Sequence, residues 1–187
     1  LKLNINDITV ATGHCAEAVA QLGYKTIENP RFATTNMVYS LFNTLSHIEP
    51  KGDLLIAYGD IIFETRILNK MLESDSGISV AIDLNWKKLW QARFPDPLND
   101  AETLLLNDDN LISEIGRKPS SFDSIQGQFV GLLKIKKELL DDLKLFYQSI
   151  DRTLALEPSS IENMYMTTFL QELIDDGWSI KAVPIRG

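Results

Sequence analysis

The chain has 187 residues, of which 44% are apolar, and its formal net charge at pH 7 is -8. This length and composition allow one α/β core, whereas the negative charge argues against sequence-independent binding to nucleic acid or to an anionic membrane. The single cysteine, Cys15, rules out an intramolecular disulfide. Without a membrane-length apolar run or a visible signal peptide, the sequence indicates a cytoplasmic protein.

Short strands and helices alternate through the first half of the chain. Glycines or an Asn-Pro pair separate them, and Thr35 or Asn36 can cap the second helix-length segment. Strands are predicted over 7–12, 24–27 and 53–58, and helices over 15–22, 37–45 and 64–73.

The second half continues this alternation but contains one interruption. The turn-forming residues 107–110 lie between two apolar runs and predict a β-hairpin. Strands are predicted over 78–82, 128–135 and 178–185, hairpin strands over 103–106 and 111–115, and helices over 137–150 and 161–175. The whole pattern predicts an α/β, Rossmann-like, mainly parallel sheet with flanking helices and a hairpin insertion beside a ligand cleft.

The most informative segment is the apolar run that ends at Tyr58-Gly59-Asp60. A buried parallel strand of this kind delivers a carboxylate to the carboxyl edge of the sheet, where open α/β sheets bind ligands. A carboxylate there can hold a divalent metal beside phosphates. The alternative is an ordinary Gly-Asp turn after a strand.

A polar turn, residues 28–36, lies between a predicted strand and the beginning of a helix. Free backbone N–H groups and amide side chains in such a turn suit a phosphate or a base edge. An Asx-type turn followed by a helix cap would have the same composition.

Asp83 follows the next predicted strand and precedes Trp86, Trp90 and Arg93. An indole beside a carboxylate suits a cationic amine, although Trp86 and Trp90, four residues apart, could equally pack on the core. Lys118 could reach a phosphate as a point charge or remain a solvated turn lysine.

Taken in order, these motifs resemble the sugar-nucleotide-pyrophosphorylase type of nucleotidyltransferase. They are most similar to its phosphocholine and 2-aminoethylphosphonate cytidylyltransferase branch. The resemblance covers nearly the whole chain and rests on Asn29-Pro30-x-Phe32-x-x-Thr35-Asn36-x-x-x-Ser40-Leu41, Gly59-Asp60, Asp83-x-x-Trp86, Arg93, Gly116-x-Lys118 and Gln126-Gly127-x-Phe129-x-Gly131-Leu132.

The resemblance implies a role for each matching residue. Asp60 would be a catalytic ligand of Mg²⁺, and Lys118 a catalytic cation near the acceptor phosphate. The implied nucleotide-binding residues are Thr35, Asn36, Ser40, Tyr58 and Gly59. The implied acceptor-binding residues are Asp83, Trp86, Arg93, Gln128 and Tyr165.

The implied reaction is transfer of CMP from CTP to a small phospho- or phosphono-amine, such as phosphocholine or 2-aminoethylphosphonate, with release of pyrophosphate. One alternative is a sugar-1-phosphate nucleotidyltransferase, and another is a non-catalytic ligand-binding domain of the same fold. A homodimer stays open.

Two family segments have no counterpart in this sequence. One is the first strand with its Gly-rich loop containing Arg and Lys, and the other is a Trp-x-Glu-x-Asp segment that binds a second metal. We therefore expect residues 1–187 to be a single nucleotidyltransferase-like domain that lacks both segments and has no turnover alone.

Overall fold

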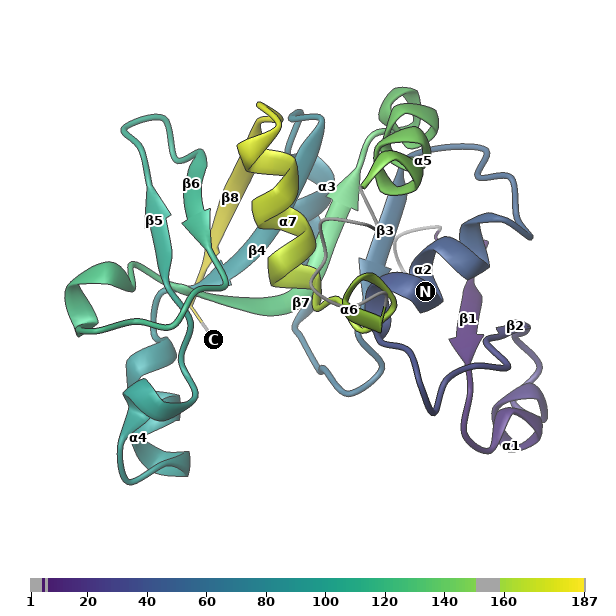
Figure 1. Ribbon diagram of the computed structural model, residues 1–187, viewed down its shortest axis with the longest axis horizontal. Helices are drawn as coiled ribbons and strands as arrows, with labels where there is room; N and C mark the ends of the chain where they lie inside the picture. The colour runs from purple at the N-terminus through teal and green to yellow at the C-terminus, as the bar shows by residue number, and fades with distance from the viewer. Residues whose placement is uncertain (1–4, 6, 151–158, 187) are drawn as a thin grey trace. The chain divides into compact units, whose positions relative to one another are not determined.

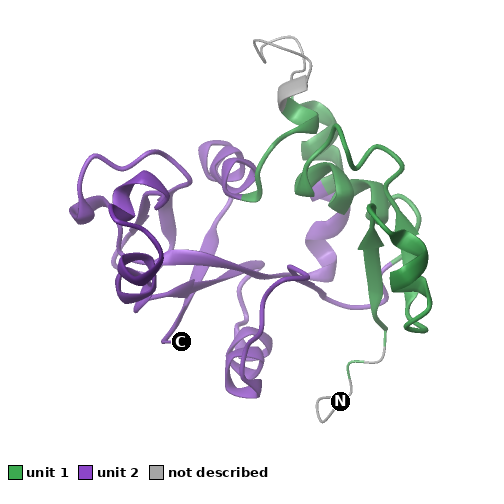
Figure 2. Ribbon diagram, turned by 90° about the horizontal axis from the view of Figure 1, so that it is seen from below, with its two compact units in different colours: residues 1–49, 144–166 green, residues 50–143, 167–187 purple. Residues whose placement is uncertain are grey.

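The computed structural model describes residues 5, 7–150 and 159–186, and helices and strands alternate along it (Figure 1). The chain divides into two compact units (Figure 2). Unit 1 comprises residues 1–49 and 144–166, and unit 2 comprises residues 50–143 and 167–187. In the part of the chain described, no helix has both the length and the apolar character needed to cross a membrane.

Unit 1 contains a two-stranded parallel sheet. Strands β1 (Thr9–Thr12) and β2 (Lys25–Glu28) pair in it, and α1 (Ala16–Ala20) connects them. Helix α2 (Met37–Leu45) buries Val38, Phe42 and Leu45. The ring of Phe42 stacks on that of Tyr147 from α5 (Leu140–Ser149), with centroids 3.8 Å apart. The strand–helix–strand–helix order predicted for this segment is confirmed.

One predicted helix, over residues 161–175, is wrong as a continuous element. The structure contains α6 (Ser159–Glu162) and α7 (Met166–Asp175) instead. The backbone carbonyl of Glu162 accepts the N–H of Asn36 (2.7 Å), and that of Asn163 accepts the side-chain amide of Asn36 (3.4 Å). A continuous helix would need these carbonyls for its own ladder. A contact distant in sequence therefore ends the helix.

The central sheet of unit 2 has four strands in the order β3–β7–β4–β8. Their bounds are β3 Leu54–Ala57, β7 Gln128–Ile135, β4 Ile78–Asp83 and β8 Ile180–Ile185. Strand β7 is antiparallel to both β3 and β4, while β4 and β8 are parallel. Three strands therefore run in one direction, and the α/β class is confirmed. The reversal of β7 was not predicted, because a buried apolar run carries no sign of its direction.

A bulge interrupts the pairing of β7 with β4 between Val80 and Ile82. The extra residues on β7 include Gly131, whose φ of 77° lies in the left-handed region that favours glycine. The bulge re-aims the beginning of β7, so that Gln128 lies opposite Asp83.

Helices cover both faces of this sheet. Ile67 and Met71 of α3 (Thr65–Glu73) pack in one cluster with Ala81, Leu132 and Val183 from the strands. Figure 1 shows α7 in front of the sheet, and its residues Phe169, Leu170 and Leu173 are buried. The core of unit 2 therefore consists of a sheet between two helical layers.

The predicted hairpin is present, and Leu111 forms an isolated bridge with Lys181 of β8. Strands β5 (Leu104–Leu106) and β6 (Ile112–Ile115) pair antiparallel, and Asn107 organises the turn by accepting the N–H groups of Asp109 and Leu111. The remaining elements are α4 (Trp86–Arg93) and the 3₁₀ helices η1 (Pro97–Asn99), η2 (Phe122–Ser124) and η3 (Lys137–Leu139).

Candidate active site

The carboxyl ends of β3 and β4 and the beginning of β7 lie at one edge of the sheet in unit 2. Because β3 and β4 run in the same direction and β7 opposes both, this edge carries Asp60, Asp83 and Gln128. The N–H of Tyr58 donates to the carbonyl of Gly131 (2.9 Å) and continues the β3–β7 ladder. This is the position where open α/β sheets bind ligands.

Asp60 is exposed in the turn that follows β3. A Cβ added to Gly59 would meet no atom within 4 Å, and the φ of Gly59 is not in the left-handed region, so the fold does not require glycine there. Among the described residues, no group of three or more His, Cys, Asp or Glu side chains could hold a metal ion. The exposed carboxylate of Asp60 still fits Mg²⁺, which uses one or two carboxylates beside substrate phosphates.

Tyr58 is half-buried against the bulge of β7. A Cβ on Gly131 would lie 2.7 Å from the Tyr58 ring, and the ring of Phe129 meets the Tyr58 ring edge-on at 5.7 Å. Burial raises the pKa of the Tyr58 hydroxyl, and the negative charges of Glu102 and Asp60 raise it further. The hydroxyl therefore stays protonated at neutral pH.

Gln128 is buried, and its amide holds the backbone of Glu102. Its Oε1 accepts the N–H of Glu102 (3.1 Å), while its Nε2 donates to the carbonyls of Glu102 (2.6 Å) and Gly127 (2.9 Å). The side chain predicted to bind the acceptor therefore fixes a neighbouring loop.

Glu102 is a half-buried carboxylate that the sequence did not single out. Its Oε1 accepts a hydrogen bond from Thr167 Oγ1 (3.2 Å). Burial raises the pKa of Glu102, the Thr167 hydroxyl lowers it, and the charge of Asp100 raises it. Its only sequence signal was its place directly before a predicted hairpin strand, which is too common to identify a site.

Asp83 and Trp86 are both buried at the end of β4. The Oδ1 of Asp83 accepts the N–H of Asn85 (2.8 Å). Trp86 belongs to a cluster with Ala101 and Ile125, and the ring of Trp90 contacts it edge-on at 6.0 Å. Packing on a core, the alternative left open for the tryptophan pair, is therefore what the structure contains. Contact of Trp86 with an acceptor stays a prediction.

The two predicted cations of unit 2 already have partners. The Nζ of Lys118 donates to the carbonyls of Leu98 and Asn99, both at 2.6 Å. The guanidinium of Arg93 lies over the ring of Trp90 at 5.8 Å. Both side chains are exposed, so a phosphate can still approach them.

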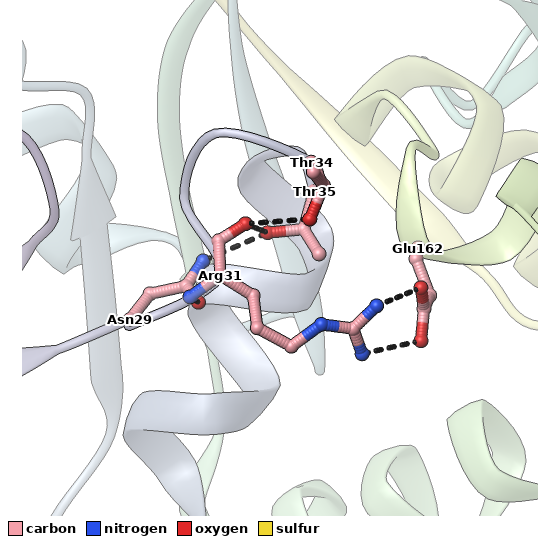
Figure 3. A network of polar contacts seen from close by, with 5 residues as sticks. All are labelled: Asn29, Arg31, Thr34, Thr35 and Glu162. Atoms are coloured by element: carbon pink, nitrogen blue, oxygen red, sulfur yellow. Dashed lines mark hydrogen bonds and ion pairs between the residues drawn. The ribbon is translucent and has the colours of Figure 1, made fainter.

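In unit 1, the polar turn is organised around the buried side chain of Asn29 (Figure 3). Its Nδ2 donates to Thr35 Oγ1 (2.9 Å) and Ser40 Oγ (3.0 Å), and its Oδ1 accepts the N–H of Arg31 (2.9 Å). Asn36 caps α2 by accepting the N–H of Met37 (2.8 Å). The structure therefore brings Thr35, Asn36 and Ser40 together, and the Asx turn and helix cap considered from the sequence are present.

Arg31 and Glu162 form a bidentate ion pair next to this turn, which the sequence did not reveal. The distances are 2.7 and 2.5 Å, and Figure 3 shows the guanidinium and carboxylate facing each other. The hydrogen bonds with Glu162 raise the pKa of Arg31. Tyr165, three residues after Glu162, is 60% exposed.

The fold defined by these elements is that of nucleotidyltransferases. Inositol-1-phosphate CTP transferase from T. maritima superposes with a TM-score of 0.63 at 18% identity, over 92% of this chain and 63% of that one. CTP:phosphocholine cytidylyltransferase from Streptococcus pneumoniae superposes with a TM-score of 0.62 at 14% identity, over 100% of this chain and 72% of that one. The chain thus spans less than two thirds of the length of the inositol enzyme.

One relative is similar enough to show the family. A CTP:phosphoglutamine cytidylyltransferase from Campylobacter jejuni is 36% identical over 192 residues, which cover 98% of this chain and 76% of the relative. No protein-family model matches the chain. The chain belongs to the cytidylyltransferase family within the sugar-nucleotide-pyrophosphorylase-type nucleotidyltransferases.

Proposed function

We propose that this protein transfers CMP from CTP to a small acceptor that carries both a phosphate or phosphonate and a cationic nitrogen. The observation that carries the proposal is the identity with a cytidylyltransferase along almost the whole chain. The exposed carboxylate of Asp60 at the carboxyl edge of the sheet supports it.

The chemistry needs no nucleophile from the protein. An oxygen of the acceptor phosphate or phosphonate attacks the α-phosphorus of CTP, and the bond from that phosphorus to the bridging oxygen breaks. The electron pair leaves with pyrophosphate, and the acceptor becomes a CMP conjugate, joined to the α-phosphorus through its own oxygen. Positioning and neutralisation of the phosphate charges are what such a transfer requires of the protein.

Asp60 would be the residue that holds Mg²⁺ at the carboxyl edge of the sheet. The metal supplies charge neutralisation on the phosphate oxygens when it is bound. Lys118 would approach the acceptor phosphate from η1, where its ammonium is already anchored. For unit 1 by itself, the nucleotide-binding role of Thr35, Asn36 and Ser40 stays a prediction.

The proposed class of acceptor is defined by the two groups that three candidate compounds share. Phosphocholine, 2-aminoethylphosphonate and phosphoglutamine each combine a phosphorus oxyanion with a cationic nitrogen at neutral pH. The relative's name supports phosphoglutamine as the first acceptor to test.

The test is pyrophosphate release by the full-length protein with each nucleoside triphosphate and each of these acceptors, in Mg²⁺. We expect release with CTP and at least one of the three, and its loss in EDTA. Release only with a hexose 1-phosphate and UTP or dTTP would select a sugar-nucleotide enzyme, and no release with any pair would refute the proposal.

A variant at the proposed metal ligand sharpens this test. Asp60→Asn should lower kcat by about 100-fold or more, as expected when a group that stabilises transition-state charge is removed. Because Asp60 is exposed, the variant should unfold at the wild-type temperature. Wild-type turnover by this variant would exclude Asp60 as the ligand.

A further inference from the structure

We propose that Glu102 binds the cationic nitrogen of the acceptor and that Gln128 is the positioning residue that holds Glu102 in place. This inference rests on the proposed function and adds the residue that selects the acceptor. It moves the acceptor-binding role from Gln128 and Trp86 to a carboxylate that the sequence did not reveal.

The first step is that Gln128 has no hydrogen left to donate to a ligand. A glutamine amide has two N–H donors. Those of Gln128 point to the carbonyls of Glu102 (2.6 Å) and Gly127 (2.9 Å). Its Oε1 accepts the Glu102 N–H at 3.1 Å, so both backbone polar groups of residue 102 are attached to one buried side chain. This arrangement fixes the backbone of Glu102, from which its side chain extends, to the beginning of β7.

The second step is that the Glu102 carboxylate has spare acceptor capacity and no cationic partner among the described residues. An ionised carboxylate offers about four acceptor positions, and Thr167 Oγ1 occupies one of them. Glu102 takes no part in the ion pairs Arg31–Glu162, Arg66–Glu64, Arg117–Glu114, Lys134–Asp53 and Lys136–Asp75. A half-buried carboxylate without a counter-ion costs free energy on folding. Such a cost is expected at a binding site where the ligand supplies the opposite charge.

The third step concerns the surroundings of Glu102. Asp100 and the Thr167 hydroxyl shift the pKa of Glu102, and the charge of Glu102 raises the pKa of Tyr58. None of these three neighbours is a cation. Such a negative environment attracts a positive ligand group. It also lies at the edge where Asp60 would hold the nucleotide phosphates. Trp86, by contrast, is 4% exposed and packs in the cluster of Ala101 and Ile125, so little of its ring can meet a ligand.

The experiment compares each acceptor with its uncharged isostere in the full-length protein, by initial rates of pyrophosphate release at saturating CTP. The isosteres are the tert-butyl analogue of phosphocholine, propylphosphonate, and the desamino form of phosphoglutamine. Glu102→Gln keeps the acceptor atom for Thr167 and removes only the charge. We expect the acceptor KM to rise roughly 10- to 100-fold, the loss expected for a charge-assisted hydrogen bond, with the KM for CTP unchanged. The preference for the cationic acceptor over its isostere should fall by the same factor.

Two matched controls separate this role from a loss of structure. Gln126 makes a similar tie to the hairpin, because its Oε1 accepts the N–H of Leu106 at 2.6 Å. Gln128→Leu should raise the acceptor KM, whereas Gln126→Leu should leave it within about twofold, the scatter of a near-neutral surface change. Glu114→Gln removes another hairpin carboxylate, which pairs with Arg117 at 3.4 Å, and should also leave the acceptor KM unchanged. If Glu102→Gln does not fold, Glu102→Asp keeps the charge, shortens its reach and should show the same selective rise.

The outcomes of the two proposals are distinguishable. A wild-type protein that releases no pyrophosphate with any acceptor refutes the proposed function. A wild-type protein that is active, with an acceptor KM that Glu102→Gln does not change, overturns this inference and leaves the function standing. An equal rise in KM for the cationic acceptor and its isostere would also overturn it.

Discussion

At the scale of single residues, Gly59 and Gly131 both lie next to Tyr58 but differ in the space that an added Cβ would have. Gly59 has open space where a Cβ would lie and an ordinary φ. Gly59→Ala should therefore change the free energy of unfolding by less than about 0.5 kcal/mol. If the nucleotide approaches this backbone closely, as the resemblance implies for Gly59, the same methyl group should raise the KM for CTP. Denaturant unfolding and steady-state kinetics measure both effects.

Gly131→Ala is the matched comparison. The φ of 77° and a Tyr58 ring carbon 2.7 Å from the added Cβ require both strain and displacement. The variant should lose about 1–3 kcal/mol of stability. Equal stability of the two alanine variants would mean that the bulge does not need its glycine.

Glu102 also predicts a pH-dependent stability. Burial raises its pKa in the folded state above the ordinary value of 4.5, so the folded protein binds the proton more tightly than the unfolded chain does. The charged carboxylate therefore destabilises the fold above the folded-state pKa, and this penalty disappears as the pH falls below 4.5. Glu102→Gln should unfold at a higher temperature than wild type at pH 8 and show no such advantage near pH 4.

The Thr167 hydroxyl gives the opposite control. It donates to the Glu102 carboxylate and lowers its pKa, so Thr167→Val should destabilise the protein more at pH 8 than near pH 4. Stability that rises in Thr167→Val at pH 8 would contradict this account. A residue that weakens the fold but strengthens acceptor binding is typical of functional sites.

At the scale of elements, the carboxyl end of α3 depends on a lysine from the sheet. The buried Nζ of Lys134 donates to the carbonyls of Leu72 (3.2 Å) and Ser74, and Asp53 Oδ2 lies at 3.9 Å. Lys134→Met keeps the length of the stem but leaves these carbonyls without that donor. We expect a loss of about 1–3 kcal/mol in denaturant unfolding.

Lys136→Met is the control for this element. Its ion pair with Asp75 is made at the surface, where the Asp75 side chain is 96% exposed, so removing it should change stability much less. If the two methionine variants were equally destabilised, the loss would come from removing a positive charge and not from removing the hydrogen bonds at the carboxyl end of α3.

Elements defined by local chemistry were predictable from the sequence. The cap of α2 at Asn36, the hairpin turn at Asn107 and the strand that ends at Asp83 all follow from residue types within a few positions. The break between α6 and α7 was not predictable, because it depends on Asn36, more than a hundred residues away.

At the scale of the whole molecule, the sequence located the carboxyl edge but not the contacts made there. Asp60 and Asp83 follow apolar runs, which is a signal that can be seen in one dimension. Gln128 hydrogen-bonds the backbone of Glu102, and Lys118 hydrogen-bonds the carbonyls of Leu98 and Asn99. These contacts depend on the tertiary fold, because the residues that they join are distant in the sequence. A pattern of residue types identifies which side chains can bind a ligand, but not which have protein partners already.

The position of β7 has a consequence for how unit 2 is made. Strands β3 and β4 are consecutive in the chain but share no hydrogen bonds, because β7 lies between them. During synthesis both strands leave the ribosome before residues 128–135, so their backbone edges have no β7 to pair with until then. Pairing over such long sequence separations favours slow folding. The strand that joins them also brings Gln128 to its place opposite Asp83. The pairing of β7 with β3 and β4 therefore closes the sheet and assembles its carboxyl edge together.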